Sequence, residues 1–211
     1  LQMGEHVQTG LGCVGHVGDY DRNRIRKHEY TRPDKEDDRV RQITALDAQT
    51  GPVLLAYRSE PTLAGILANV ARGEAACDIT APDGVRHAIW VLDDPQLVAH
   101  VTQLVDRMDA LYIADGHHRS AAASRVAAAR RAADPAAPAD ADWNYFLCVA
   151  FPHDEMRILD YNRLVADLHG HSAADFLAAL GSAFTVAPAA GQARPGRPGE
   201  FGLYLEGRWH R

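Results

Sequence analysis

The stretch LYIADGHHRS, residues 111–120, constrains the fold of this chain more than any other. A short apolar run ends at Asp115 and Gly116, and a helix-prone, alanine-rich segment continues over 120–133. This order predicts a strand, a tight turn and a helix. The first backbone N–H groups of a helix lack internal partners and carry the positive end of the helix dipole. Such a turn is therefore a candidate phosphate site.

The side chains of this turn suit the same chemistry. Gly116 would allow the backbone to approach a ligand closely, and Arg119 can make a bidentate bond to phosphate oxygens. Asp115 could orient a ligand hydroxyl, bind Mg²⁺ or act as a base. The alternative is that Asp115 only caps the helix and Arg119 lies on a solvated face. Two adjacent histidines are a costly choice for a turn that only caps.

His117 and His118 are expected to form hydrogen bonds rather than to bind a metal ion. Adjacent side chains usually diverge, whereas zinc pairs use spacings such as HxxxH or HxH. The sequence HGH at 169–171 has such a spacing, but no third ligand is evident beside it. Imidazole bonding to phosphate or to the loop itself is therefore favoured.

A densely charged segment over 21–42 is predicted to be an exposed loop with a short helix near 34–43. A dense series of charged residues usually forms a solvent-exposed surface with no binding role, and this alternative to a functional site stays open. Loops nevertheless carry active residues more often than their share. The segment offers Glu29 as a proton acceptor and cations that could clamp phosphates. The cations that we predict to bind phosphate are Lys27, Arg32 and Lys35.

Two weaker motifs lie elsewhere in the chain. DYNR at 160–163 leaves a predicted strand with Asn162 and Arg163, which are candidate substrate-binding residues; the alternative is a plain strand-end turn. GLGCVG at 10–15 matches GxGxxG, but the following residues show no helical character. A glycine-tolerant strand is therefore favoured there over a dinucleotide site.

The other elements are predicted from periodicity and from turn signals. Strands are expected at 51–58, 85–92, 145–151 and 156–161, the last two as a hairpin. Helices are expected at 61–73, 94–109 and 172–184, with Ser172 as a cap. The Pro/Ala/Asp-rich stretch 134–142 is predicted to be a mobile linker. Because helices and strands mix without a regular repeat, we expect one α+β domain over 1–211.

Composition excludes several classes of protein. The formal net charge of −6 argues against broad attraction to nucleic acid or to anionic membranes, although a small polyanion is still allowed. No apolar run is long enough to span a membrane and no signal peptide is visible, so we expect a cytoplasmic protein. The three cysteines have no CxxC spacing and are expected to be buried, reduced thiols. The first residue, Leu1, and the abrupt final hairpin suggest a piece of a longer protein.

Five blocks together resemble the family called domain of unknown function 1015, over essentially the whole chain. They are RIRKHEYTRPDKEDDR, AQTGPVLLAYR, YIADGHHRSAAA, NYFLCVAF and RILDYNRLV. The DGHHR turn also resembles the phosphate-binding box of ParB-type CTPases, sulfiredoxin and the free-serine kinases. The resemblance implies a mixed sheet with flanking helices, as a ParB/sulfiredoxin-like core with insertions. It also implies that ATP, ADP or CTP binds with Mg²⁺ through Asp115, Gly116, His117, His118, Arg119 and Ser120.

The resemblance implies a nucleotide-dependent phosphotransferase that acts on a small, serine-like hydroxyl compound. In this hypothesis Arg119 and His118 neutralise phosphate charge, Mg²⁺ lies near Asp115, and Glu29 accepts the hydroxyl proton. The alternative is a nucleotide-binding switch or regulatory module without phosphoryl transfer. DNA binding is less favoured, since the chain is acidic and shows no helix-turn-helix. A metal-dependent hydrolase is the remaining, less favoured possibility. The sequence does not predict an oligomeric state.

Overall fold

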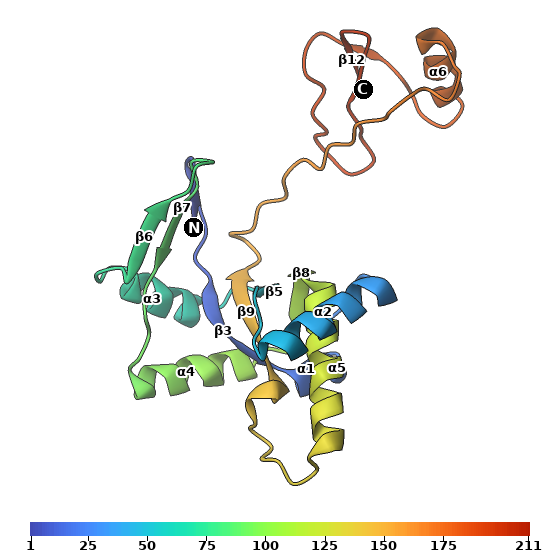
Figure 1. The fold of residues 1–211 in the computed structure, drawn as a ribbon. Helices are drawn as coiled ribbons and strands as arrows, with labels where there is room; N and C mark the ends of the chain where they lie inside the picture. The colour runs from blue at the N-terminus through green and yellow to red at the C-terminus, as the bar shows by residue number, and fades with distance from the viewer. The chain divides into compact units, whose positions relative to one another are not determined.

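The computed structural model describes residues 1–211 and has the predicted α+β class. Its contacts group the chain into two compact units, Leu1–Ile158 and Leu159–Arg211. The sequence predicted a single domain over 1–211. The division into two units comes from the structure alone. Figure 1 shows both units, and each is described by itself below.

The first unit is built on a five-stranded mixed sheet in the order β3-β9-β5-β8-β4. Its strands are β3 (Leu11–His16), β4 (Ile25–Arg26), β5 (Val53–Tyr57), β8 (Leu111–Asp115) and β9 (Tyr145–Pro152). In the middle of the sheet, β5 runs parallel to β9 and antiparallel to β8. Val53, Leu55 and Tyr57 are buried at alternating positions of β5, as expected when successive side chains point to opposite faces.

Helices flank this sheet. They are α1 (Val17–Asp21), α2 (Pro33–Leu46), α3 (Pro61–Val70), α4 (Pro95–Asp106) and α5 (His117–Ala133). In Figure 1, α3 and α4 lie on one side of the sheet, and α2 and α5 lie next to each other on the other side. The core joins Leu63 of α3, Leu104 of α4 and Ala127 of α5 to the buried strand residues.

A second sheet of the first unit is antiparallel, in the order β2-β1-β7-β6. Its strands are β1 (Gln2–Met3), β2 (His6–Val7), β6 (Cys77–Thr80) and β7 (Arg86–Ile89). Every residue of β6 is exposed, and an ion pair between Arg86 and Asp78 links β7 to β6 on the surface. This sheet therefore adds little to the core.

Most predicted elements of the first unit are present. The strands expected at 51–58, 85–92, 111–115 and 145–151 correspond to β5, β7, β8 and β9, and the helices expected at 61–73 and 94–109 correspond to α3 and α4. Gly12 and Gly15 lie within β3, as the strand interpretation requires, although the short helix α1 follows. The stretch 134–142 is a loop between α5 and the 3-10 turn η1 (Asp142–Asn144); its mobility stays a prediction.

One local prediction was wrong, and one predicted helix is longer than expected. The stretch 156–161 forms no strand and no hairpin with β9. The physical reason is that β9 already pairs with β3 on one edge and with β5 on the other, so it has no free edge. The charged segment also contains more helix than expected, because α2 extends over Pro33–Leu46 instead of the short stretch 34–43.

The second unit contains α6 (Ala173–Leu180) and an antiparallel sheet in the order β10-β12-β11. These strands are β10 (Pro188–Ala189), β11 (Leu203–Leu205) and β12 (Arg208–His210). The predicted cap of α6 is confirmed, since the hydroxyl of Ser172 accepts a hydrogen bond from the N–H of Asp175 at 3.2 Å. The predicted final hairpin turns at Glu206 and Gly207, both with positive φ.

Candidate functional site

The turn between β8 and α5 has the predicted strand-turn-helix geometry. Gly116 is the N-cap of α5 and has a φ of +100°, a conformation that favours glycine. The first hydrogen bond of the helix runs from the N–H of Ser120 to the carbonyl of Gly116, at 3.0 Å. The N–H groups of His117, His118 and Arg119 precede it and have no partner within the helix. They remain available to an anion.

A cavity of about 460 Å³ opens beside this turn. One wall is the stretch 115–119, and Glu29 belongs to another. The lining is completed by Arg39, Gln42 and Ile43 of α2, together with the loop residues 49–51. Its volume lies within the range of about 300–1,000 Å³ that is usual for small-ligand sites.

Glu29 meets His117 in this cavity. The side chain of His117 is 4% exposed, and its Nδ1 lies 3.4 Å from Oε2 of Glu29. The ring of His28 packs edge-on against it, with 4.5 Å between the centroids. Nε2 of His117 is buried and has no hydrogen-bond partner. A buried polar atom without a partner is costly, so this nitrogen is a candidate to bond a ligand.

Burial lowers the pKa of His117, and the neighbouring His28 lowers this pKa further, while Glu29 acts in the opposite direction. The imidazole is therefore neutral near pH 7, with one nitrogen as donor and the other as acceptor. With the carboxylate of Glu29 beside Nδ1, the proton is favoured on that nitrogen. Nε2 is then the acceptor.

Two arginines supply positive charge. Arg119 donates to the carboxylate of Asp115 at 2.6 Å, and its guanidinium lies over Gly116, where a Cβ would be 3.0 Å from Nε. Arg39 donates to Oε1 of Gln42 at 2.8 Å and keeps about half of its side chain exposed. A phosphate at the turn would share Arg119 with Asp115, whereas Arg39 has only weak competition from Asp38 at 3.8 Å.

His118 and Ser120 have structural partners. Nε2 of His118 accepts a hydrogen bond from the N–H of Arg32 at 3.1 Å, which fixes the start of α2 against the turn. Ser120 is fully buried, and its hydroxyl is within bonding distance of the carbonyls of Gly116 and His117, at 3.3 and 3.1 Å. His118 still lines the cavity, but Ser120 does not. The phosphate contact predicted for Ser120 stays a prediction.

The three predicted cations do not line the cavity. Nζ of Lys27 lies 3.7 Å from the centre of the Tyr20 ring, and Arg32 pairs with Asp34 at 2.9 Å. Lys35 is exposed on the first turn of α2. The order of charges along a loop does not reveal which way each side chain points. For this reason the predicted cations differ from the arginines that line the cavity.

The predicted substrate-binding residues Asn162 and Arg163 belong to the second unit. Both are exposed, and the guanidinium of Arg163 lies 3.7 Å from the centre of the Tyr161 ring. The structure describes the two units separately, so the role of these residues stays a prediction.

Sequence reasoning missed several residues of the cavity. Arg39, Gln42 and Ile43 are spaced by three and four, so they share one face of α2, and this signal could have identified them. Gln49 carried no signal. Its amide donates to the carbonyl of Tyr145 at 2.9 Å and accepts from the N–H of Leu147 at 2.7 Å, so it ties the cavity wall to β9.

The structure contains no group of three or more His, Cys, Asp or Glu side chains that could hold a metal ion. Magnesium is commonly held by one or two carboxylates together with substrate phosphates. The exposed carboxylate of Asp115, next to the candidate phosphate site, fits that limited requirement.

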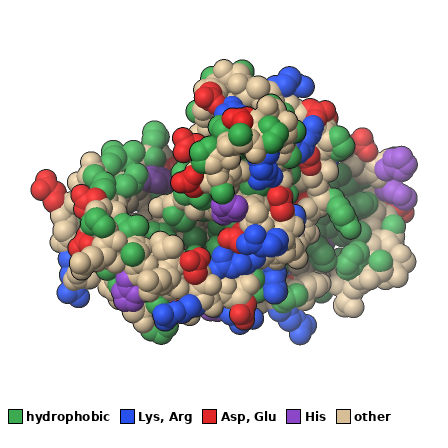
Figure 2. All heavy atoms as spheres, turned by 90° about the horizontal axis from the view of Figure 1, so that it is seen from below, with side chains coloured by type: hydrophobic (Ala, Val, Ile, Leu, Met, Phe, Trp, Pro, Cys, Tyr) green, Lys and Arg blue, Asp and Glu red, His purple; other side chains and the backbone are tan.

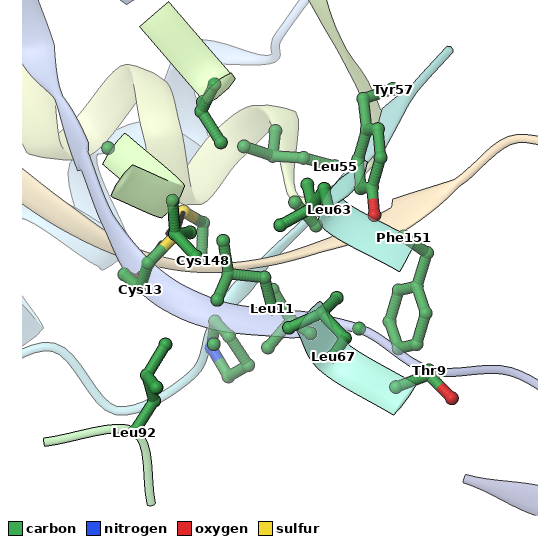
Figure 3. A pocket seen from close by; sticks show the side chains of 18 of the residues that line it. Thr9, Leu11, Cys13, Leu55, Tyr57, Leu63, Leu67, Leu92, Cys148 and Phe151 are labelled. Atoms are coloured by element: carbon green, nitrogen blue, oxygen red, sulfur yellow. Dashed lines mark hydrogen bonds between the residues drawn. The ribbon is translucent and has the colours of Figure 1, made fainter. Parts of the chain in front are cut away.

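A second, larger cavity of about 1,170 Å³ lies between β3, β5, β9 and the helices α3 and α4. Figure 3 shows that leucines from β3, β5 and α3 point into it. Tyr57 also lines it, and burial, with smaller contributions from Glu155 and Asp154, raises the pKa of this phenol to about 12. The sequence did not predict this cavity, because apolar residues at strand and helix spacing also describe a filled core.

The charges on the surface are mixed. On the face drawn in Figure 2, Lys and Arg side chains are interspersed with Asp and Glu side chains. A single broad basic patch, as expected for nucleic-acid binding, is not visible on that face. The helices of the structure are too short or too polar to cross a lipid bilayer.

Comparison with known proteins gives one match. The family described as "Protein of unknown function (DUF1015)" matches residues 1–211. No curated protein and no solved structure matches the chain. Since the family match covers every residue, the chain belongs to the DUF1015 family.

Proposed function

We propose that this protein is a cytoplasmic, nucleotide-dependent phosphotransferase that acts on a small, serine-like hydroxyl compound. One observation carries the proposal: the open helix N-terminus at Gly116 and the carboxylate of Glu29 belong to the same cavity. Phosphoryl transfer requires mainly a phosphate cradle, positive charge and a positioned proton acceptor. The cavity offers a candidate for each.

The cradle is the N-terminus of α5. Three N–H groups without helical partners would donate to phosphate oxygens, and the glycine lets them come close. Arg39 and Arg119 would add charge-assisted bonds. The overall charge of −6 disfavours long nucleic acids, so we propose free ATP, ADP or CTP as the phosphate donor.

Glu29 is the proposed general base. Its side chain is 60% exposed, so an acceptor hydroxyl can reach the carboxylate. The hydroxyl oxygen would attack the terminal phosphorus, the bond to the leaving phosphate oxygen would break, and the proton would pass to Glu29. The neutral ring of His117 would hold the carboxylate in position through Nδ1. His118 would keep the segment of Glu29 in place by bonding the N–H of Arg32.

Asp115 is the residue that would hold Mg²⁺ when the nucleotide binds. The ion would supply neutralising charge to the phosphate oxygens. Asp115 also pairs with Arg119, so its carboxylate positions that arginine beside the turn.

The proposal is tested first by binding. Thermal unfolding is measured with ATP, ADP or CTP and Mg²⁺, since a ligand that binds only the native state raises the midpoint. We expect at least one nucleotide to raise the midpoint for the wild type and Glu29→Gln, and not for Arg119→Ala. If none raises the midpoint of the wild type, the proposal is wrong.

Transfer is tested second. The protein is incubated with Mg²⁺, the bound nucleotide, and serine or related alcohols, and the products are analysed by mass spectrometry. We expect a phosphorylated alcohol from the wild type and at least a hundredfold less from Glu29→Gln, in line with the ~10²–10⁴-fold contribution of general bases. Nucleotide binding without a phosphorylated product would instead support the alternative, a regulatory module.

A further inference from the structure

Cys13 and Cys148 face each other across β3 and β9. They are direct partners in the antiparallel register, and their sulfur atoms are 3.6 Å apart. Figure 3 shows the two side chains next to each other on the wall of the large apolar cavity. The third cysteine, Cys77, is exposed on β6 and outside this cavity.

The backbone is already suitable for a bond between these sulfurs. Residues directly opposite in an antiparallel pair have Cα atoms about 4.5–5.5 Å apart, and disulfides span Cα separations of about 4.4–6.8 Å. Only the sulfur atoms must move, from 3.6 Å to a bond length of about 2.05 Å. Small side-chain rotations can therefore close the bond without rearranging the sheet.

The two thiols differ in reactivity. They share one hydrogen bond, which lowers the pKa of Cys13 and, together with burial, raises the pKa of Cys148. Cys13 is partly exposed, whereas the side chain of Cys148 is 1% exposed. Since Cys13 is the more accessible sulfur, we expect it to meet an oxidant first as the nucleophile, with the buried Cys148 as the resolving thiol.

We propose that Cys13 and Cys148 form a redox-responsive thiol pair, which a hydroperoxide converts to an intramolecular disulfide. The Cys13 thiolate attacks a peroxide oxygen, the O–O bond breaks, and a sulfenic acid and hydroxide (or alkoxide) result. The thiol of Cys148 then attacks the sulfur of this sulfenic acid, and water leaves with the thiol proton. Two thiols are oxidised and one peroxide is reduced. A dithiol reductant then reduces the disulfide back to two thiols by exchange and is itself oxidised.

The test uses the whole chain, reduced and then freed of reductant. It is treated with hydrogen peroxide, quenched, denatured and alkylated, and its peptides are mapped by mass spectrometry. We expect the Cys13 and Cys148 peptides to be linked, Cys77 alone of the three cysteines to be alkylated, and dithiothreitol to restore all three thiols. The matched control Cys77→Ser should form the same link.

The order of the two steps has its own test. In Cys148→Ser the sulfenic acid on Cys13 has no resolving thiol, so dimedone should label Cys13. In Cys13→Ser no comparable label should appear on Cys148. The proposal is overturned if all three wild-type thiols stay alkylatable, if Cys13 ends only as a sulfinic acid, or if the disulfides formed all include Cys77.

Discussion

Oε2 of Glu29 lies 3.4 Å from Nδ1 of His117, an imidazole that is 4% exposed. This contact joins the charged segment to the turn after β8, two parts of the chain that are far apart in sequence. The same contact places a carboxylate next to an open helix N-terminus in one cavity.

Arg39 and Arg41 provide a matched pair on α2, because Arg39 lines the cavity and Arg41 pairs with Asp38 at the surface. If Arg39 bonds a phosphate, Arg39→Ala should weaken binding of the Mg²⁺–nucleotide complex by about tenfold or more. Arg41→Ala should leave it within about twofold, since exposed ion pairs contribute little. Isothermal titration calorimetry measures both, and equal affinities for the two variants would exclude Arg39 from the site.

Gly116→Ala should destabilise the protein. With φ at +100°, an alanine costs about 1–2 kcal/mol, and its Cβ would crowd the guanidinium of Arg119. Gly65→Ala is the opposite control, because Gly65 lies inside α3 with open space around it and should stabilise by about 0.5–1 kcal/mol. Urea unfolding compares the two variants. A neutral Gly116→Ala would contradict the left-handed turn.

The pH dependence of stability should depend on His117. Burial lowers its pKa in the folded state, so the unfolded state takes up a proton first as the pH falls below about 6.5. The stability present above that pH is then lost progressively down to the folded-state pKa. His117→Gln should flatten this acid slope just below about pH 6.5. Thermal unfolding over a pH series measures the slopes, and an unchanged slope for His117→Gln would refute this assignment.

Gln49→Ala should cost about 1–2 kcal/mol, because the carbonyl of Tyr145 and the N–H of Leu147 would both lose their partner. Gln42→Ala removes only one exposed bond with Arg39 and should change stability by less than about 0.5 kcal/mol. Chemical denaturation with both variants decides this. Equal losses would show that Gln49 does not brace β9.

Local signals in the sequence were sufficient for several features. The apolar run 111–115, the glycine and the alanine-rich stretch predicted the strand, turn and helix at the site, and all three are present. The cap at Ser172 was also predictable, since it depends on residues only three apart. The strand predicted at 156–161 is absent. A strand must pair with a free edge of a neighbouring strand, and both edges of β9 are already paired.

By itself the sequence determined the α+β class, the order of most elements and the position of the strand-turn-helix, because these depend on periodicity and on conformational preferences of neighbouring residues. Only the tertiary structure decided which distant side chains meet. In the folded chain Arg39 and Gln49 line the cavity. The ammonium group of Lys27 lies over the ring of Tyr20, and Cys13 pairs with Cys148 across two strands. Such contacts follow from helix packing and strand register, which bring together residues with no local relationship in the chain.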